Sequence, residues 1–377
     1  MRLQEANPKK MNIHNLPSPN PAFEQKRAAM ITLLLGAAAL ATPAAYALPA
    51  YARADGISCI VCHVRADRLN SVGLDYYQKG FRSEVKAAGS TMPVRTNLGA
   101  FLSGQGQLNW RKDQGKDYTT SNQITLYGTG ALGGNFSFLA ETTVNPPDAQ
   151  EVADLYLGYT SGTKNNYQFL RLGQMLPLIA VDNPYEVAAD RDPVFVRDRR
   201  QGISYGYNYG RFWVEGLALS SAGPKTGNKA DWVLNGQYLF DDEGTSLGFL
   251  YWDGSYNSDS GLSDKFRRLE LLGNYNGIKN TYLTAGYSTA TGDSGAGGED
   301  KSKGWFGQAE YAITDQWTFL VHAIDVNPDK GDGKAVWTFS LNYWPHQNVA
   351  LRLQLVETKP DSGPSRSSVR ARVRIMF

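Results

Sequence analysis

Five consecutive residues, Cys59-Ile60-Val61-Cys62-His63, carry the most specific chemistry in this chain. Two cysteines three positions apart can each bond one vinyl group of the same porphyrin, and the histidine that follows can bind the iron from one face. The sequence contains no other cysteine. The pattern therefore predicts one covalent haem c, attached through Cys59 and Cys62, with His63 as the proximal iron ligand.

Two other chemistries use a pair of cysteines at this spacing. A structural zinc site needs two further soft ligands, but the chain has no second cysteine pair and only four histidines. A redox-active dithiol does not require a histidine directly after the second cysteine. The haem interpretation accounts for all three side chains.

The first residues are typical of a secretory signal peptide, which we place at 1–47. Lys26-Arg27 precedes an apolar run over 28–41, and the small-residue sequence Ala45-Tyr46-Ala47 follows. The apolar run is shorter than the roughly 20 residues that span a bilayer. The predicted mature chain then leaves the cytoplasm.

The mature chain is close to electrical neutrality. Without 1–47 it has 33 basic and 34 acidic residues, a formal net charge of −1. This balance gives no electrostatic reason to expect a nucleic-acid partner.

Residues 97–377 alternate between apolar and polar side chains. Segments of roughly ten residues with this period are separated by Gly, Asn, Asp, Ser and Pro, and we count about sixteen of them. The pattern predicts an all-β fold, an outer-membrane β-barrel of about sixteen strands facing lipid on one side and the lumen on the other. A soluble all-β protein shows the same alternation. The signal peptide and the charges on the polar faces favour the membrane.

The last segment is the clearest of these strands. Over 369–377 five apolar residues alternate with Arg370, Arg372 and Arg374, and the chain ends with Phe377. Three arginines on one face would not point into the core of a soluble protein. We expect these three and Arg352 to line the lumen on neighbouring strands, either as ordinary porin wall or as groups that bind the haem propionates and raise the haem potential.

Residues 48–96 form the predicted haem c segment. A helix is expected from Arg68 to about Ala88, because apolar residues from Leu69 to Val85 can share one side. Forty-nine residues are too few to form a stable core alone. We therefore expect this segment to plug the barrel lumen.

The haem motif and its surroundings resemble a known family. The residues concerned are Pro49-Ala50-Tyr51-Ala52-Arg53-Ala54-Asp55-Gly56, the haem motif, and then Leu69, Gly73 and Phe81. They resemble the corresponding residues of the fused monohaem cytochrome–porins, which are outer-membrane iron oxidases of Fe(II)-oxidising bacteria. The specific likeness covers roughly residues 48–83. The resemblance implies that extracellular Fe(II) gives an electron to the haem and that a periplasmic c-type cytochrome, or another periplasmic carrier, collects it.

Three other functions remain open from the sequence. The conduit could run outward to an extracellular acceptor, since the sequence does not fix a direction. The barrel could be a diffusion porin with a haem-bearing plug. A secreted haem enzyme such as a peroxidase would need distal acid–base residues, and His63 is the only histidine of the haem segment.

The sixth iron ligand is expected to be Met92, which lies 29 residues after His63 and directly before Pro93. A thioether ligand raises the haem potential relative to a second histidine, which suits an acceptor of electrons from Fe(II). Its rivals in the mature chain are Met175, Met376, His322 and His346.

The haem prediction is tested by Cys62→Ser. Loss of one thioether bond should strongly reduce haem staining of the denatured protein on a gel, because only covalently attached haem survives denaturation. Full staining in a Cys59→Ser/Cys62→Ser variant would end the hypothesis.

Overall fold

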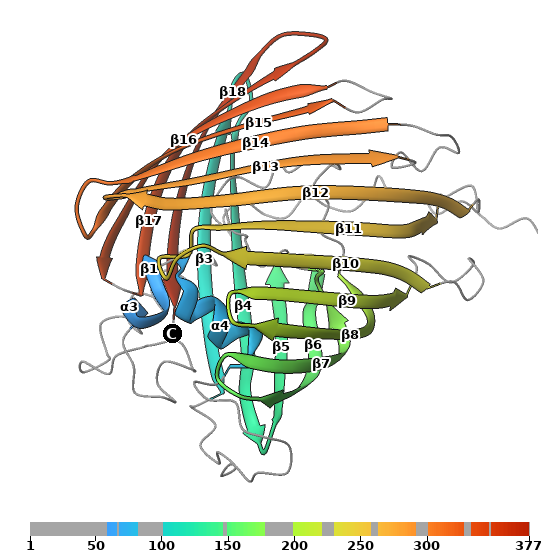
Figure 1. The fold of residues 1–377 in the computed structure, drawn as a ribbon. Coiled ribbons are helices and arrows are strands. Elements are labelled where there is room, and N and C mark those ends of the chain that lie inside the picture. Colours follow the sequence, from blue (N-terminus) through green and yellow to red (C-terminus); the bar gives the residue numbers. More distant parts are fainter. Residues whose placement is uncertain are drawn as a thin grey trace, which may run out of the picture. The chain divides into compact units, whose positions relative to one another are not determined.

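The computed structural model describes residues 59–65, 68–81, 101–145, 149–177, 199–220, 230–257, 263–291, 301–327, 333–346 and 348–376. Sixteen of its strands form one closed barrel (Figure 1). Their bounds are β3 (Leu102–Asp113), β4 (Tyr118–Gly133), β5 (Phe136–Asn145), β6 (Ala149–Gly162), β7 (Asn166–Met175), β8 (Arg200–Tyr209), β9 (Phe212–Ser220), β10 (Ala230–Leu239), β11 (Ser246–Asn257), β12 (Ser263–Ile278), β13 (Thr281–Thr291), β14 (Lys301–Ala312), β15 (Trp317–Asn327), β16 (Lys334–His346), β17 (Val349–Pro360) and β18 (Arg366–Met376).

Each barrel strand pairs antiparallel with the next strand in sequence, and β18 returns to pair with β3. In that closing pair Arg370 lies opposite Arg111 and Arg374 lies opposite Gln107. Closure leaves no sheet edge, as a β-structure surrounded by hydrocarbon requires. The all-β prediction with about sixteen strands is confirmed.

The connections differ in length between the two ends of the barrel. One end carries short turns such as 134–135, 163–165 and 210–211. Segments such as 176–199 and 221–229 connect strands at the other end. Bacterial barrels have short periplasmic turns and longer extracellular loops, so we refer to these as the periplasmic and extracellular ends. Strand β18 ends at the periplasmic end.

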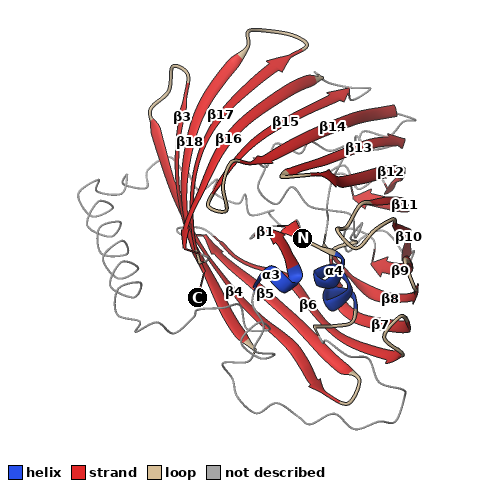
Figure 2. Ribbon diagram, turned by 60° about the vertical axis from the view of Figure 1, so that its left-hand side comes forward, coloured by secondary structure: helices blue, strands red, loops and turns tan. Residues whose placement is uncertain are grey.

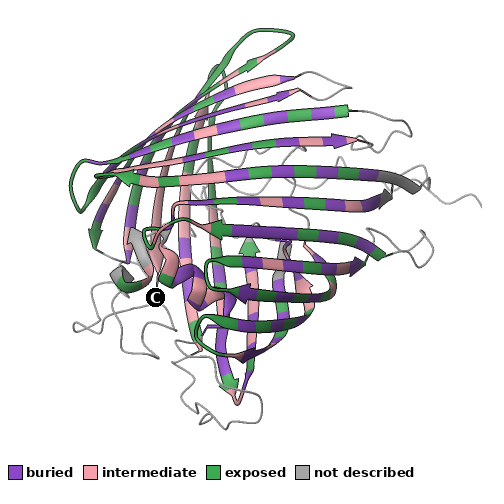
Figure 3. Cartoon of the chain, viewed as in Figure 1, coloured by how far each residue is buried: buried purple, intermediate pink, exposed green. Residues whose placement is uncertain are grey.

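Buried and exposed residues alternate along many of the barrel strands (Figure 3). On β4, Ile124 and Leu126 are exposed on the outer surface, whereas Thr125 between them is buried. On β17, Leu353 is exposed and Arg352 is buried. The outer surface is therefore apolar and suited to lipid, as the sequence pattern predicts.

The predicted charged face is on the inner wall. Arg171, Glu310 and Arg352 are all buried, each on the face opposite to the exposed apolar residues of its strand. Most of the buried polar and charged side chains share this inner face, which is the arrangement of a polar barrel lumen.

Before the barrel lie four short elements: α3 (Cys59–Cys62), β1 (His63–Arg65), β2 (Arg68–Leu69) and α4 (Ser71–Gln78). Figure 2 shows α3 and α4 within the ring of strands. The prediction of one helix from Arg68 to about Ala88 was wrong at both ends, since α4 ends at Gln78. Arg68 and Leu69 form a strand with β1, and the helix begins at Ser71 because the Asn70 side chain caps it.

The lipid-facing surface predicts the effect of an added charge. Leu126→Arg places a cation in hydrocarbon, which costs about 2–4 kcal/mol at the bilayer midplane, so urea unfolding from vesicles should shift to lower denaturant. Gln123→Arg, on the inner face of the same strand, is the matched control. Equal shifts in the two variants would contradict this assignment of faces.

Candidate haem-attachment site

The cysteines of the motif belong to one helical turn. Cys59–Cys62 form α3, and positions three apart in a helix lie on the same face. Cys62 is partly exposed. His63 follows at once as the first residue of β1, where it lies opposite Leu69 of β2. The backbone thus places both cysteine positions toward one side and the histidine next to them, which fits a covalently attached haem.

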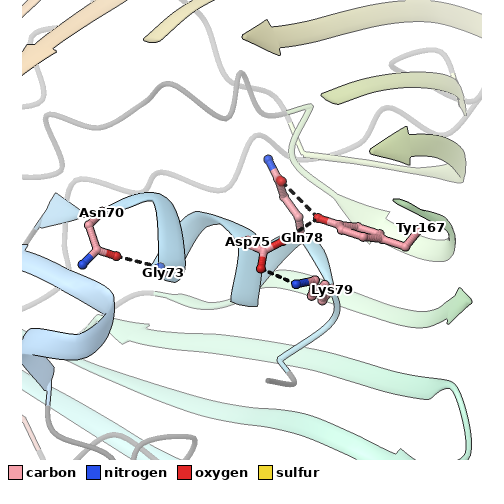
Figure 4. A network of polar contacts seen from close by, with 6 residues as sticks. All are labelled: Asn70, Gly73, Asp75, Gln78, Lys79 and Tyr167. Atoms are coloured by element: carbon pink, nitrogen blue, oxygen red, sulfur yellow. Dashed lines mark hydrogen bonds and ion pairs between the residues drawn. The ribbon is translucent and has the colours of Figure 1, made fainter. Parts of the chain in front are cut away.

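One asparagine connects this turn to the next helix. The Asn70 backbone amide donates to the Cys62 carbonyl at 3.0 Å, and its side-chain nitrogen donates to the Val61 carbonyl at 3.1 Å. Its side-chain oxygen accepts from the Gly73 amide at 2.9 Å (Figure 4). Asn70 therefore closes the end of α3 and caps the start of α4 with one side chain.

Helix α4 packs against the inner wall through a polar network (Figure 4). The Tyr167 hydroxyl on β7 lies 3.2 Å from Asp75 Oδ1 and 3.3 Å from Gln78 Oε1, within donating distance of both. The ammonium group of Lys79 forms an ion pair with Asp75 and lies 5.4 Å from the centroid of the Tyr167 ring. The Lys79 side chain is 1% exposed, and a buried charge of this kind requires such a partner.

A cluster of aromatic rings around Arg171 lies beside this network. The guanidinium carbon of Arg171 is 4.7 Å from the Phe169 ring centroid and 5.6 Å from those of Tyr77 and Tyr156. Its Nη1 atom is 3.4 Å from Glu215 Oε1. Burial raises the pKa of Tyr77 well above its ordinary value. The helix is thus joined to the wall by cation–π as well as polar contacts.

The end of α4 is a Schellman turn. The Gly80 amide donates to the Tyr77 carbonyl and the Phe81 amide to the Tyr76 carbonyl. Gly80 has a φ of +74°, and the Phe81 and Tyr76 rings are 6.5 Å apart, which is the apolar contact typical of this motif. A β-carbon on Gly80 would collide with the Ser137 side chain of β5, so the turn lies directly on the wall.

The helix lies at the periplasmic end of the barrel. The Ser71 hydroxyl donates to the Asp242 carbonyl at 2.6 Å, in the short turn between β10 and β11. Tyr167 and Ser137, which contact the other end of the helix, are each the second residue of a strand that begins at this end. The haem motif is therefore connected to the periplasmic mouth of the barrel.

Met92 lies outside the described residues, so its role as the sixth iron ligand stays a prediction. The structure places the other candidate ligands at different positions along the barrel axis. Met175 is buried at the extracellular end of β7, eight residues or about 26 Å along the strand from Tyr167. His322 is buried on the inner face of β15, where its ring stacks on Phe306 at 5.8 Å. His346 and Met376 end β16 and β18, at the same end as α4.

Several residues of the site were not among those predicted from the sequence. Asn70 had a usable signal, since an asparagine directly before an apolar-periodic segment is a typical helix N-cap. No sequence signal marked Tyr167, Arg171 or Lys79, because their contacts join segments that are about 90 residues apart.

Among the described residues, no group of three or more His, Cys, Asp or Glu side chains is arranged to hold a metal ion. No helix in the described part of the chain is long and apolar enough to cross a membrane.

Solved structures of outer-membrane channels resemble this chain. The Acinetobacter baumannii outer membrane channel DcaP matches with a TM-score of 0.58 and 14% identity, over 73% of this chain and 96% of that one. The anion-selective porin from Comamonas acidovorans matches with a TM-score of 0.56 and 16% identity, over 76% of this chain and 99% of that one. Salmonella typhi OmpF gives 0.56 and 11%, over 73% and 97%.

No protein-family model matches the sequence, and neither does any curated protein sequence. At these identities the likeness shows the fold. The closed sixteen-stranded barrel with an apolar outer surface defines the chain as an outer-membrane β-barrel of the porin type.

The Schellman turn offers a test of how α4 is held. Gly80→Ala forces a side chain into a left-handed conformation, which costs about 1–2 kcal/mol, and also presses its β-carbon against Ser137. We expect faster hydrogen exchange and proteolysis over residues 71–81.

Gly115→Ala is the matched control. Gly115 has a φ of +73°, and a β-carbon added there would meet no atom within 4 Å, so this variant carries the backbone cost alone. If α4 kept its full exchange protection in Gly80→Ala, the described packing against β5 would be contradicted.

Proposed function

We propose that this protein is an outer-membrane cytochrome–porin that passes electrons from extracellular Fe(II) through a single haem c to a periplasmic c-type cytochrome or similar carrier. One observation carries the proposal: the Cys59–His63 turn is joined through Asn70 to a helix that packs on the inner wall of a porin-type barrel. When bound, the haem supplies a centre that accepts one electron from Fe(II) and donates it to the carrier.

The contacts of α4 support a position of this proposed centre near the periplasm. The Ser71 contact with Asp242 and the Tyr167 contact with Asp75 both lie at the end with short turns. A periplasmic carrier can approach this mouth closely, which favours transfer because electron tunnelling weakens steeply with distance.

The same placement determines where Fe(II) must react. The apolar band of such a barrel is about 25 Å tall, so a donor held at the extracellular surface would be far from the periplasmic mouth. A small hydrated cation can instead enter a polar lumen. The proposal therefore requires the barrel to act as the entrance for Fe(II), which gives the porin architecture a role in the reaction.

The direction of electron flow in this proposal rests on the resemblance to the cytochrome–porins. An outward conduit to an extracellular acceptor would use the same attachment site with the opposite driving force. Mixing the reduced protein with Fe(III), and the oxidised protein with Fe(II), separates the two directions.

A second candidate is a diffusion porin whose haem segment is a plug. The likeness of the barrel to the channels from Acinetobacter, Comamonas and Salmonella favours it. It differs from the first in that small solutes, rather than electrons, would be the cargo.

Fe(II) oxidation is tested by adding Fe(II) to the purified, detergent-solubilised protein at acid and neutral pH. The absorption bands of reduced haem should appear after Fe(II) is added. Cys59→Ser/Cys62→Ser, which retains the barrel but not the attachment site, should show no such bands.

Vesicles containing the protein distinguish the two candidates. With cytochrome c on the periplasmic side and Fe(II) on the other, the conduit predicts reduction of cytochrome c by vesicles with the wild type and not by those with Cys59→Ser/Cys62→Ser, whereas Fe(II) that simply diffuses through the barrel would reduce it in both. If the haem stayed oxidised after addition of Fe(II) and the vesicles swelled in isotonic sugar, the result would support the diffusion porin and contradict the conduit.

A further inference from the structure

Three polar side chains are neighbours on the inner wall at the periplasmic end of the barrel: Asn208 on β8, Trp213 on β9 and Gln237 on β10. Asn208 is directly opposite Trp213, and Trp213 is directly opposite Gln237. Their exposed fractions are 5%, 3% and 2%. Directly opposite strand positions have β-carbons about 4.5–5.5 Å apart, so each side chain is within reach of the next. We call these three residues the amide–indole row.

Two contacts of helix α4 with the barrel bracket this row. On one side Tyr167, which is directly opposite Asn208, contacts Asp75 of the helix (Figure 4). On the other side the Ser71 hydroxyl donates to the carbonyl of Asp242, in the turn that follows β10. The row therefore lies on the strands between these contacts, at the end of the barrel that holds the attachment turn.

The row contains buried polar atoms that make no hydrogen bond within the described part of the chain. They are Trp213 Nε1 and both polar atoms of the Gln237 side chain, Nε2 and Oε1. The Trp213 ring is stacked on Phe169, with centroids 5.9 Å apart and an angle of 8° between the planes. Buried donors without acceptors are costly, and most buried polar groups in folded proteins are paired. These atoms therefore indicate a polar group that binds between them.

The donors define the chemistry of that group. An indole nitrogen only donates, whereas a glutamine amide donates through its nitrogen and accepts through its oxygen. Glu215, the wall carboxylate two residues along β9, already accepts from Arg171 at 3.4 Å and from Asn235 at 3.4 Å. A carboxyl group from a ligand fits the row, because its two oxygens can accept from Trp213 and Gln237 together.

We propose that Trp213 and Gln237 bind a carboxyl group of a ligand through indole Nε1 and amide Nε2. Two ligands carry this chemistry: the haem, through its propionates, and a free carboxylic acid that enters the lumen. The haem source rests on the proposed function, whereas the free acid does not.

The position of the row suits the haem source. The attachment turn is joined through Asn70 to the Ser71 end of α4, beside the turn that follows β10, and Gln237 is on that strand. A haem carries its propionates on the edge of the ring opposite the vinyl groups that cysteines bond. The row thus offers donors for carboxyl groups at the end of the barrel where the haem is attached in the proposed function.

The test variant is Trp213→Phe/Gln237→Leu, which removes both donors and keeps an aromatic ring beside Phe169. Trp344→Phe/Gln308→Leu makes the same replacements at buried, inward positions of β16 and β14 and is the matched control. Resonance Raman spectra of the haem-loaded protein report on the haem propionates, whose bending band shifts when a hydrogen bond to them is lost. Calorimetric titration of the same protein with sodium propionate, in detergent, reports on a free carboxylate.

Haem propionates predict a shifted bending band in the test variant alone and no uptake of propionate ion by the haem-loaded wild type. A free carboxylic acid predicts an unshifted band in both variants. It also predicts uptake by the wild type that weakens about tenfold or more in the test variant alone, because two hydrogen bonds are lost. If neither measurement separated the test variant from the control, the proposal would be overturned.

Failure of the proposed function would be distinguishable from failure of this site. Haem that is attached but not reduced by Fe(II) would contradict iron oxidation, and the band shift could still be measured. If no haem were attached, the titration with sodium propionate alone would decide for or against the carboxyl site.

Discussion

The hydrogen-bonded closure between β18 and β3 is the constraint on which the rest of this structure depends. In hydrocarbon an unpaired backbone amide has no water to bind, so the sheet must close completely. Closure couples the registers of all sixteen strands, since a slip in one strand pair must be offset in another if Arg370 is to lie opposite Arg111. Register in turn decides which side chains face lipid, because a shift of one residue would exchange the two faces. The inward position of Arg352 and the docking site of α4 both follow from it.

The haem segment depends on the barrel for much of its own stability. Helix α4 has eight residues, which is too short for a helix to persist alone in water. The helix is stabilised instead by its Asn70 cap, its Schellman turn and its contacts with Tyr167 and Ser137. The attachment turn is joined to α4 through the hydrogen bonds of Asn70. A weak helix held at both ends by the barrel is therefore the physical connection between the chemistry of the motif and the membrane.

The location of that helix gives the barrel a role in the proposed reaction. A redox centre at the periplasmic mouth is close to its carrier but distant from the extracellular surface. If a small cation can pass through the lumen, it can reach the redox centre despite the distance from the extracellular surface. The charged inner wall then influences which ions approach. On that wall Arg171 pairs with Glu215 and Arg200 pairs with Asp231.

The sequence by itself determined the class of fold and predicted the chemistry of the attachment site. Both depend on short-range patterns: a period of two places Ile124 and Leu126 on one face whatever their partners, and Cys59, Cys62 and His63 are adjacent in the chain. It also placed Arg352 and Arg370 on inward faces, from alternation alone. Only the tertiary structure decided which strands are neighbours in the closing pair and at which end of the barrel the predicted haem segment lies. Those features depend on contacts between segments about 90 or more residues apart, such as Tyr167 with Asp75 and Ser71 with Asp242, and local periodicity carries no information about such distances.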